Sequence, residues 1–146
     1  MTPRFGRVLT AMISPFTEDG SLDIDGAQTL AKWLVEQGNE GLVIAGTTGE
    51  SPTLTHEEQI NLIDAVVESV DVPVIAGAGS NDTKAAVELT ERCTEVGASG
   101  ILTVTPYYNR PSQLGLLAHF SAVAQATDLP VMLYDIPIRS GRKIDT

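Results

Sequence analysis

Several residue types are scarce in this chain, and their scarcity excludes whole classes of protein. Its 146 residues include one cysteine, two histidines and only 5% aromatic residues. A disulfide needs two cysteines, so none can form within the chain, and the composition fits a reducing compartment. We therefore predict a cytoplasmic location. Cys93 lies in a helical pattern, where we expect a buried small hydrophobe rather than a reactive thiol.

Long apolar runs and positive charge are also in short supply. No stretch approaches the roughly 18 apolar residues of a membrane-spanning helix. The apolar segment from Val8 runs into Pro15, too soon for a signal peptide. Nine Lys and Arg residues stand against 19 Asp and Glu, for a net charge of −10. Such a surface repels phosphate backbones and anionic lipid, so we expect no nucleic-acid and no membrane partner.

Familiar cofactor and metal motifs are missing as well. His56 and His119 lie far apart and lack the spacing of a zinc site, so we predict no metal. The segment GAGSND, at 77–82, lacks the third glycine of a dinucleotide fingerprint, and no Gly-Lys-Ser/Thr completes a phosphate loop. No Ser/His/Asp set has credible spacing. The sequence gives no reason to expect a cofactor.

Five short apolar runs are present, and they recur regularly. They are continuous rather than alternating, which is typical of parallel strands buried on both faces. Their starts are separated by about 30 residues, as in repeated βα units. The runs are VLTAMIS from Val8, GLVIAG from Gly41, VPVIAG from Val72, GILTVTP from Gly100 and LPVMLYD from Leu129.

Helical patterns fill the gaps between these runs. A helix over residues 24–37 is followed by Gly38 as a stop signal, and Thr55 with Glu58 forms a capping box for the second. The third helix begins at Asn81 or Asp82 and the fourth at Ser112. We expect the fourth helix to bury Leu114, Leu117, Phe120 and Ala124.

The alternation is compatible with an open doubly wound sheet or with a (βα)8 barrel. A barrel typically needs about 250 residues, so the pattern alone favours the open sheet. In both architectures active sites lie at the carboxyl ends of the strands, and the polar segments of this chain follow those ends.

Three polar segments stand out. GTTGES, at 46–51, is either an ordinary turn or a backbone site for an anion. TPYYNRPS, at 105–112, offers adjacent tyrosines to a subunit contact or to a substrate. In YDIPIRSG, at 134–141, Tyr134 suits a proton relay. Arg139 suits a substrate carboxylate, or it pairs merely with Asp135.

Together, GTTGES, VIAGAGSN, VTPYYNRPSQ-G and YDIP-RSG, in that order, resemble the dihydrodipicolinate synthase family of pyruvate-dependent class I aldolases. The resemblance implies an α/β protein of the TIM (βα)8 barrel type, with residues 1–146 forming the N-terminal part of one barrel domain and about its first five βα strands. It also implies a lyase of lysine and diaminopimelate biosynthesis, self-associating as a homodimer or homotetramer. Its reaction would be a Schiff-base aldol condensation of pyruvate with L-aspartate 4-semialdehyde.

The resemblance also implies roles for individual residues. Tyr134, Thr47 and Tyr108 would form a hydroxyl relay, with Tyr108 supplied across a dimer interface. Thr48 would bind the pyruvate carboxylate and Arg139 that of the semialdehyde. A phenol with a pKa near 10 is a poor acid or base alone, so linked hydroxyls help it exchange protons.

The Schiff-base lysine of the family has no counterpart here. The lysines are Lys32, Lys84 and Lys143. The first two lie on expected helices and Lys143 lies in the loop just after Arg139, before any sixth strand, so none matches the Schiff-base position. We therefore expect this chain alone to lack imine-forming activity. We also expect its half barrel, with two open strand edges, to need self-association or a complementing half.

An inhibitory lysine site is a further feature of the family. Four residues match its positions: Ser51, His56, Asn81 and Tyr107. Gln59 and Ala85 do not, because lysine-sensitive relatives often carry His and Glu there, so the resemblance does not imply feedback inhibition. Two other functions stay open: another pyruvate aldolase, acting on N-acetylneuraminate or a keto-deoxy sugar acid, and a non-catalytic fragment.

Overall fold

The computed structural model describes residues 3–145, in which strands and helices alternate as predicted. The strands are β1 (Leu9–Ala11), β2 (Gly41–Ile44), β3 (Val74–Gly77), β4 (Gly100–Val104) and β5 (Val131–Tyr134). The helices are α1 (Ile24–Glu36), α2 (His56–Ser69), α3 (Thr83–Glu95), α4 (Gln113–Gln125) and the short α5 (Pro137–Ser140), with a 3₁₀ turn η1 (Ser51–Thr53) before α2.

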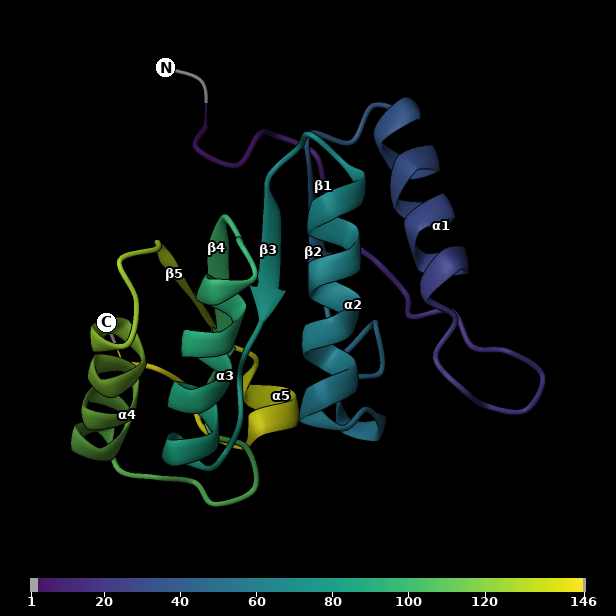
Figure 1. Cartoon of the computed structure of the whole chain (residues 1–146). Coiled ribbons are helices and arrows are strands. Elements are labelled where there is room, and N and C mark those ends of the chain that lie inside the picture. Colours follow the sequence, from purple (N-terminus) through teal and green to yellow (C-terminus); the bar gives the residue numbers. More distant parts are fainter. Residues whose placement is uncertain (1–2, 146) are drawn as a thin grey trace.

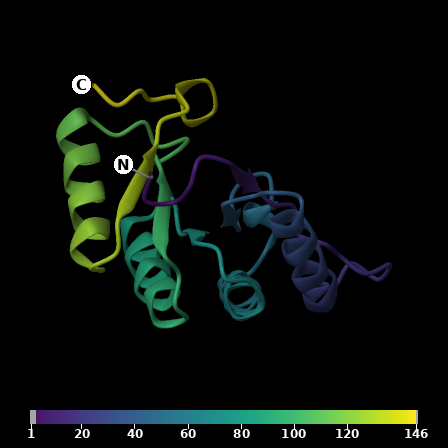
Figure 2. The same ribbon diagram turned by 90° about the horizontal axis from the view of Figure 1, so that it is seen from above.

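The sheet follows the order of the chain. All neighbouring strands are parallel, and the order is β1-β2-β3-β4-β5. Helices α1 to α4 lie along one side of it (Figure 1), and seen from above they surround the outside of the strands (Figure 2). A doubly wound sheet would reverse its strand order and carry helices on both faces. The open sheet favoured by pattern alone is therefore wrong, and the barrel architecture implied by the resemblance is confirmed as part of a barrel wall.

The core lies between the sheet and its helices. Leu42, Ala76 and Ile101 from the strands are fully buried there, together with Leu62 and Ile63 from α2. Close strand contact depends on Gly77, where a Cβ atom would lie 2.3 Å from the carbonyl oxygen of Ala45. The missing side chain lets the turn after β2, in which Ala45 has a φ of 55°, lie against β3.

Helix starts agree with the side-chain signals. Thr55 caps α2, and its hydroxyl accepts a hydrogen bond from the amide of Glu58 while the Glu58 carboxylate accepts one from the Thr55 amide. The third helix is capped by Asp82 rather than by Asn81, and Ser112 caps α4 as expected. These caps satisfy amides that a helix cannot pair internally.

Two burial predictions are wrong. On α4, Leu114 and Leu117 are 79% and 64% exposed and Ala124 is exposed as well, so Phe120 alone of the four expected residues is buried. The other buried residues of the helix are Leu116, His119 and Val123. On β5, Met132 and Leu133 are 40% and 47% exposed, although a strand buried on both faces was expected. Within residues 3–145, β1 and β5 each have a strand on one side only, which explains the exposure of β5.

Cys93 is buried on α3, as expected, and burial raises the pKa of its thiol to about 12. A thiol with this pKa is not a nucleophile at neutral pH. None of the helices in residues 3–145 has the length and hydropathy needed to cross a membrane. The same residues contain no cluster of three or more His, Cys, Asp or Glu side chains suited to a metal ion.

Candidate active site

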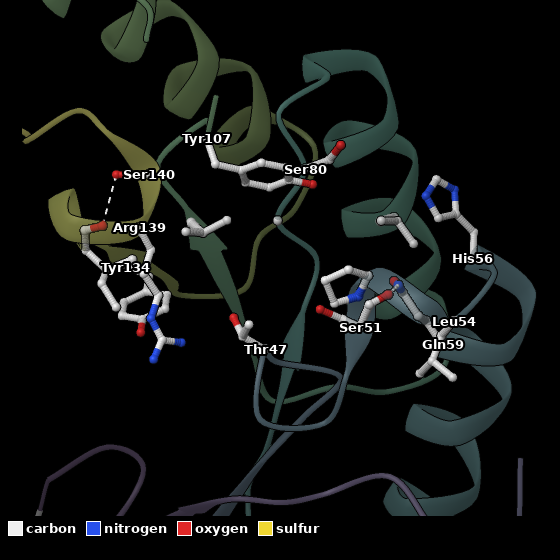
Figure 3. Close-up of a pocket in the computed structure, with 15 residues that line it drawn as sticks. Thr47, Ser51, Leu54, His56, Gln59, Ser80, Tyr107, Tyr134, Arg139 and Ser140 are labelled. Carbon is white, nitrogen blue, oxygen red and sulfur yellow. Dashed lines mark hydrogen bonds between the residues drawn. The ribbon is translucent and has the colours of Figure 1, made fainter. Parts of the chain in front are cut away.

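A cavity of about 360 Å³ opens at the carboxyl ends of β2 to β5 (Figure 3). Its walls come from four βα units, and η1 and the first turn of α2 form one side. The lining residues are Thr47, Ser51, Pro52, Leu54, His56, Gln59, Gly79, Ser80, Leu89, Val104, Tyr107, Tyr134, Ile136, Arg139 and Ser140.

The charge of this lining is opposite to that of the molecule. The chain has a net charge of −10, yet no Asp or Glu lines the cavity among the described residues. The charged or titratable side chains there are Arg139, His56 and two tyrosines. A fixed guanidinium without a competing carboxylate suits a small carboxylated ligand.

The loop after β2 presents Thr47 to the cavity. Its backbone closes through hydrogen bonds from the Glu50 amide to the Thr47 carbonyl (3.1 Å) and from the Ser51 amide to the Gly46 carbonyl (3.3 Å). The buried Ser14 hydroxyl donates to the carbonyl of Gly49 at 2.6 Å. Backbone and Ser14 therefore hold the loop, and the Thr47 side chain remains exposed. Thr48 is also exposed but does not line the cavity.

The two adjacent tyrosines point to different places. Tyr107 lines the cavity and is 40% exposed, whereas Tyr108 is 90% exposed and lies outside it. Asn81 and Asn109 join this loop to the end of β3, since the Asn81 amide nitrogen donates to the Asn109 side-chain oxygen at 2.9 Å. The structure therefore does not bring Tyr108 to Tyr134 and Thr47 within one chain, and its role across an interface stays a prediction.

Tyr134 and Arg139 both reach the cavity from the end of β5 (Figure 3). The alternative pairing of Arg139 with Asp135 is wrong, because the ion pairs of residues 3–145 are Lys84 with Glu88 and Arg92 with Glu57. Asp135 instead accepts a hydrogen bond from the amide of Ile144 at 3.2 Å. The Arg139 guanidinium is thus available to a ligand.

Three of the four residues matched to an inhibitory lysine site lie together at the cavity. Ser51, His56 and Tyr107 line the cavity, whereas Asn81 does not line it and its side-chain nitrogen donates to the Tyr107 carbonyl at 3.3 Å. Gln59 is buried, and its side-chain nitrogen donates to the Ser51 carbonyl at 2.8 Å. This end of the cavity therefore offers hydroxyl and imidazole groups but no carboxylate.

None of the lysines reaches the cavity. Lys32 lies on the exposed side of α1 and Lys84 on α3, where it pairs with Glu88 at 3.7 Å. Lys143 is exposed in the segment after α5. None of these three lysines lines the cavity, and the expectation that the chain alone forms no imine stays a prediction.

Sequence reasoning missed Ser140, which is only 2% exposed and lines the cavity. Its hydroxyl lies 3.1 Å from the carbonyl oxygen of Ile136 and 2.9 Å from that of Arg142, so it holds the turn that carries Arg139. Ser80 and Ile136 were also missed. The position of Ser140 beside Arg139 was the one available signal.

A chain-ordered parallel sheet with outer helices, and a cavity with hydroxyl groups and an arginine at its carboxyl ends, define the class of βα-barrel enzymes. Within that class, the model of the Dihydrodipicolinate synthetase family matches residues 4–146, and the chain belongs to this family. Its members that resemble the chain are lyases of the class I aldolase type.

Similar proteins agree with this assignment. A 4-hydroxy-tetrahydrodipicolinate synthase from Acidothermus cellulolyticus is 59% identical over 97% of this chain and 46% of its own length. One from Moorella thermoacetica is 56% identical over 97% and 49%. The solved dihydrodipicolinate synthase from Bacillus anthracis is 49% identical, with a TM-score of 0.95 over 99% of this chain and 50% of its own. The chain spans about half the length of the relatives it matches.

Proposed function

We propose that this chain supplies the substrate-binding and proton-relay groups of a 4-hydroxy-tetrahydrodipicolinate synthase. The observation that carries the proposal is the meeting of Thr47, Tyr134 and Arg139 at one cavity without a carboxylate. Pyruvate and L-aspartate 4-semialdehyde both carry carboxylates, which such a lining accommodates. A dihydrodipicolinate synthase from Acinetobacter baumannii, 40% identical, has been solved in complex with pyruvate. The proposal places the reaction in the cytoplasm.

In the proposed reaction, an amine condenses with the keto group of pyruvate and releases water to form an imine. Loss of a methyl proton gives an enamine, whose carbon forms a bond to the aldehyde carbon of the semialdehyde. The aldehyde oxygen takes up a proton at this step. Tyr134, linked to Thr47, accepts and donates these protons, and Arg139 holds the carboxylate of the semialdehyde. Thr48 does not line the cavity in this structure, so its proposed role of holding the pyruvate carboxylate requires its loop to turn it toward Thr47.

A second copy of the chain completes the relay in this proposal. Tyr108 is 90% exposed and does not line the cavity of its own chain, so its phenol is free to contact a second copy. A self-associated dimer would place this phenol beside the Tyr134 of the partner. Tyrosine is well suited to such a place because it combines an apolar ring with a polar hydroxyl.

The imine-forming amine comes from outside residues 1–146 in this proposal. Borohydride reduction in the presence of pyruvate tests this point directly, because it converts an imine into a stable secondary amine. The chain alone should gain no pyruvyl mass. An adduct on Lys32, Lys84 or Lys143 would contradict the proposal.

Condensation itself is tested by grafting residues 1–146 in place of the matching segment of the Acidothermus cellulolyticus relative. The graft should consume both pyruvate and the semialdehyde, and Tyr134→Phe should lower kcat by roughly 10²-fold or more, the range of a lost proton-transfer group. Tyr107→Phe is the matched control and should retain a larger share of kcat.

The same graft separates the alternatives. A graft that forms the pyruvate imine but cleaves N-acetylneuraminate or a keto-deoxy sugar acid, and ignores the semialdehyde, would favour another pyruvate aldolase. A folded graft that forms no imine at all would favour a non-catalytic role.

We also propose that lysine is a weak inhibitor at most. A relative from Cyanidioschyzon merolae, 47% identical, has been solved with lysine bound. In this chain the corresponding end of the cavity lacks a carboxylate for the lysine ammonium, and the Gln59 nitrogen is already bonded to Ser51. Titration of lysine into the graft should leave its rate nearly unchanged, and Ala85→Glu should increase sensitivity.

A further inference from the structure

Two loops of the cavity, from different βα units, meet outside it. We call residues 106–112 the tyrosine loop and residues 136–142 the arginine turn. The Arg142 Nε atom donates a hydrogen bond to the carbonyl of Pro111 at 2.6 Å. Gln113, at the start of α4, reinforces the junction, because its Nε2 donates to the Lys143 carbonyl at 2.9 Å and its Oε1 accepts from the Asp145 amide at 3.2 Å.

The tyrosine loop needs such support because its backbone is strained. Tyr108 and Arg110 have φ angles of 69° and 49°, in the left-handed region that disfavours residues other than glycine. Residues of this kind persist where surrounding contacts fix them. On the β3 side, Asn81 and Asn109 provide the contact. On the β5 side, Arg142 does so.

The arginine turn is itself well held. The buried Ser140 hydroxyl lies within hydrogen-bonding distance of two carbonyls, those of Ile136 and Arg142. Gly141 has a φ of 75°, and a Cβ there would lie 2.9 Å from the Arg110 Nε atom. The turn therefore lies close to the tyrosine loop. Its fixed backbone also fixes the direction in which the Arg142 side chain extends.

We propose that Arg142 is a positioning residue that fixes the tyrosine loop against the arginine turn. Through its hydrogen bond to Pro111 it sets the placement of Tyr108 relative to Arg139. The roles of those two side chains in catalysis rest on the proposed function, but the hydrogen bond and its effect on the loop do not. Arg142 is half-buried and does not line the cavity.

Amide hydrogen exchange of the whole chain tests the contact without reference to activity. Arg142→Met removes the donor, whereas Arg142→Gln keeps a nitrogen donor at the same number of bonds from the backbone without the charge. Exchange of the Asn109 amide, which donates to the Tyr107 carbonyl at 2.8 Å, should be roughly fivefold faster in R142M, the value of one net hydrogen bond, and within about twofold of the parent in R142Q. Exchange in β3 should be unchanged in both.

Arg92→Met is the matched control, because it removes a partly exposed guanidinium that contacts Glu57 on another helix. It should leave the tyrosine loop unchanged. The proposal is overturned if R142M exchanges like the parent, if R142Q is as fast as R142M, or if R92M has the same effect. Should R142M fail to fold, Arg142→Lys keeps the charge but displaces the donor, and it should also accelerate exchange in the loop.

Kinetics of the grafted enzyme provide a second measurement. R142M should raise KM for the semialdehyde and lower kcat, because Arg139 and Tyr108 are displaced, while KM for pyruvate should stay unchanged. R142Q should restore both values. If the graft catalyses no condensation, the proposed function fails while the exchange result still decides the role of Arg142. Equal changes in the KM of both substrates would contradict selective positioning.

Discussion

Asn81 and Asn109, 28 residues apart in the sequence, form a reciprocal pair. The Asn81 side-chain nitrogen donates to the Asn109 side-chain oxygen at 2.9 Å, and the Asn109 nitrogen donates to the Asn81 carbonyl at 3.0 Å. Each asparagine thus uses its amide to join the loop after β3 to the loop after β4. The pair is the side-chain link between these two loops on the β3 side of the tyrosines.

Removal of this pair should lower the stability of the chain by a measurable amount. Asn109→Ala should lower the free energy of unfolding by about 1 kcal/mol, since it deletes two exposed hydrogen bonds of modest net value. Chemical denaturation gives the measurement. Asn61→Ala, an exposed position on α2, is the control and should stay within about 0.5 kcal/mol of the parent. Equal effects of the two substitutions would show that the pair contributes nothing.

Gly77→Ala should lower the free energy of unfolding by more than the addition of one methyl group suggests. The added methyl group would lie 2.3 Å from the Ala45 carbonyl oxygen, and a backbone atom cannot rotate away. We expect a loss of about 2 kcal/mol or more in the free energy of unfolding, within the range of an overpacked core. Gly46→Ala is the matched control, because its methyl group would meet only a Val43 methyl at 3.8 Å. It should be neutral or slightly stabilising.

The stability of the chain should fall below neutral pH partly because of His119. Its ring is buried, and its Nδ1 lies 2.9 Å from the Thr83 hydroxyl. Burial lowers the pKa of His119 in the folded chain below its ordinary 6.5. The unfolded chain then binds more protons as pH falls through about 6.5, so the stabilising contribution is complete above that pH and is lost progressively below it.

Denaturation curves between pH 7.5 and 5.5 measure this effect. His119→Gln should show a smaller decrease in unfolding free energy than the parent over this range. Asn61→Gln, at an exposed position on α2, changes no titrating group and should follow the parent curve. Curves of the same slope for the parent and H119Q would exclude His119 as the source.

The capping box of α2 should contribute to stability through Thr55. Its hydroxyl accepts from the Glu58 amide at 3.2 Å, and hydrogen bonding to Thr55 lowers the pKa of the Glu58 carboxyl. Thr55→Ala should lower the thermal midpoint, with a cost of about 1 kcal/mol. Thr55→Ser keeps the acceptor and should retain most of the stability. A serine variant as unstable as the alanine variant would contradict the capping role.

The sequence predicts helix starts and strands correctly because the interactions that determine them are local. Thr55 and Ser112 cap their helices through amides three residues away, so the signal lies within one turn. The five apolar runs likewise predict five strands. These runs do not distinguish a barrel from an open sheet, because strand order depends on long-range packing. The resemblance of the motifs to a known family indicates the barrel.

The errors on α4 and β5 have physical reasons. No charged residue occurs in α4, so its sequence has no polar face to indicate direction, and Leu114 and Leu117 were assigned to the buried side. The exposure of Met132 reflects the missing neighbour of β5, which a strand pattern does not encode. At the site, Tyr134 and Arg139 were recognisable from motifs. The contacts of Asn109 and Arg142 join segments about 30 residues apart and leave no local pattern.

The strand order has a consequence for how the chain is made. Each strand pairs with the one translated immediately before it, across a separation of about 30 residues. Within residues 3–145 each of these pairings therefore closes a chain segment of similar, moderate length, and the entropic cost of closing it is lower than for a more distant partner. The sheet can therefore grow in step with synthesis, with each new βα unit added to an edge that is already in place.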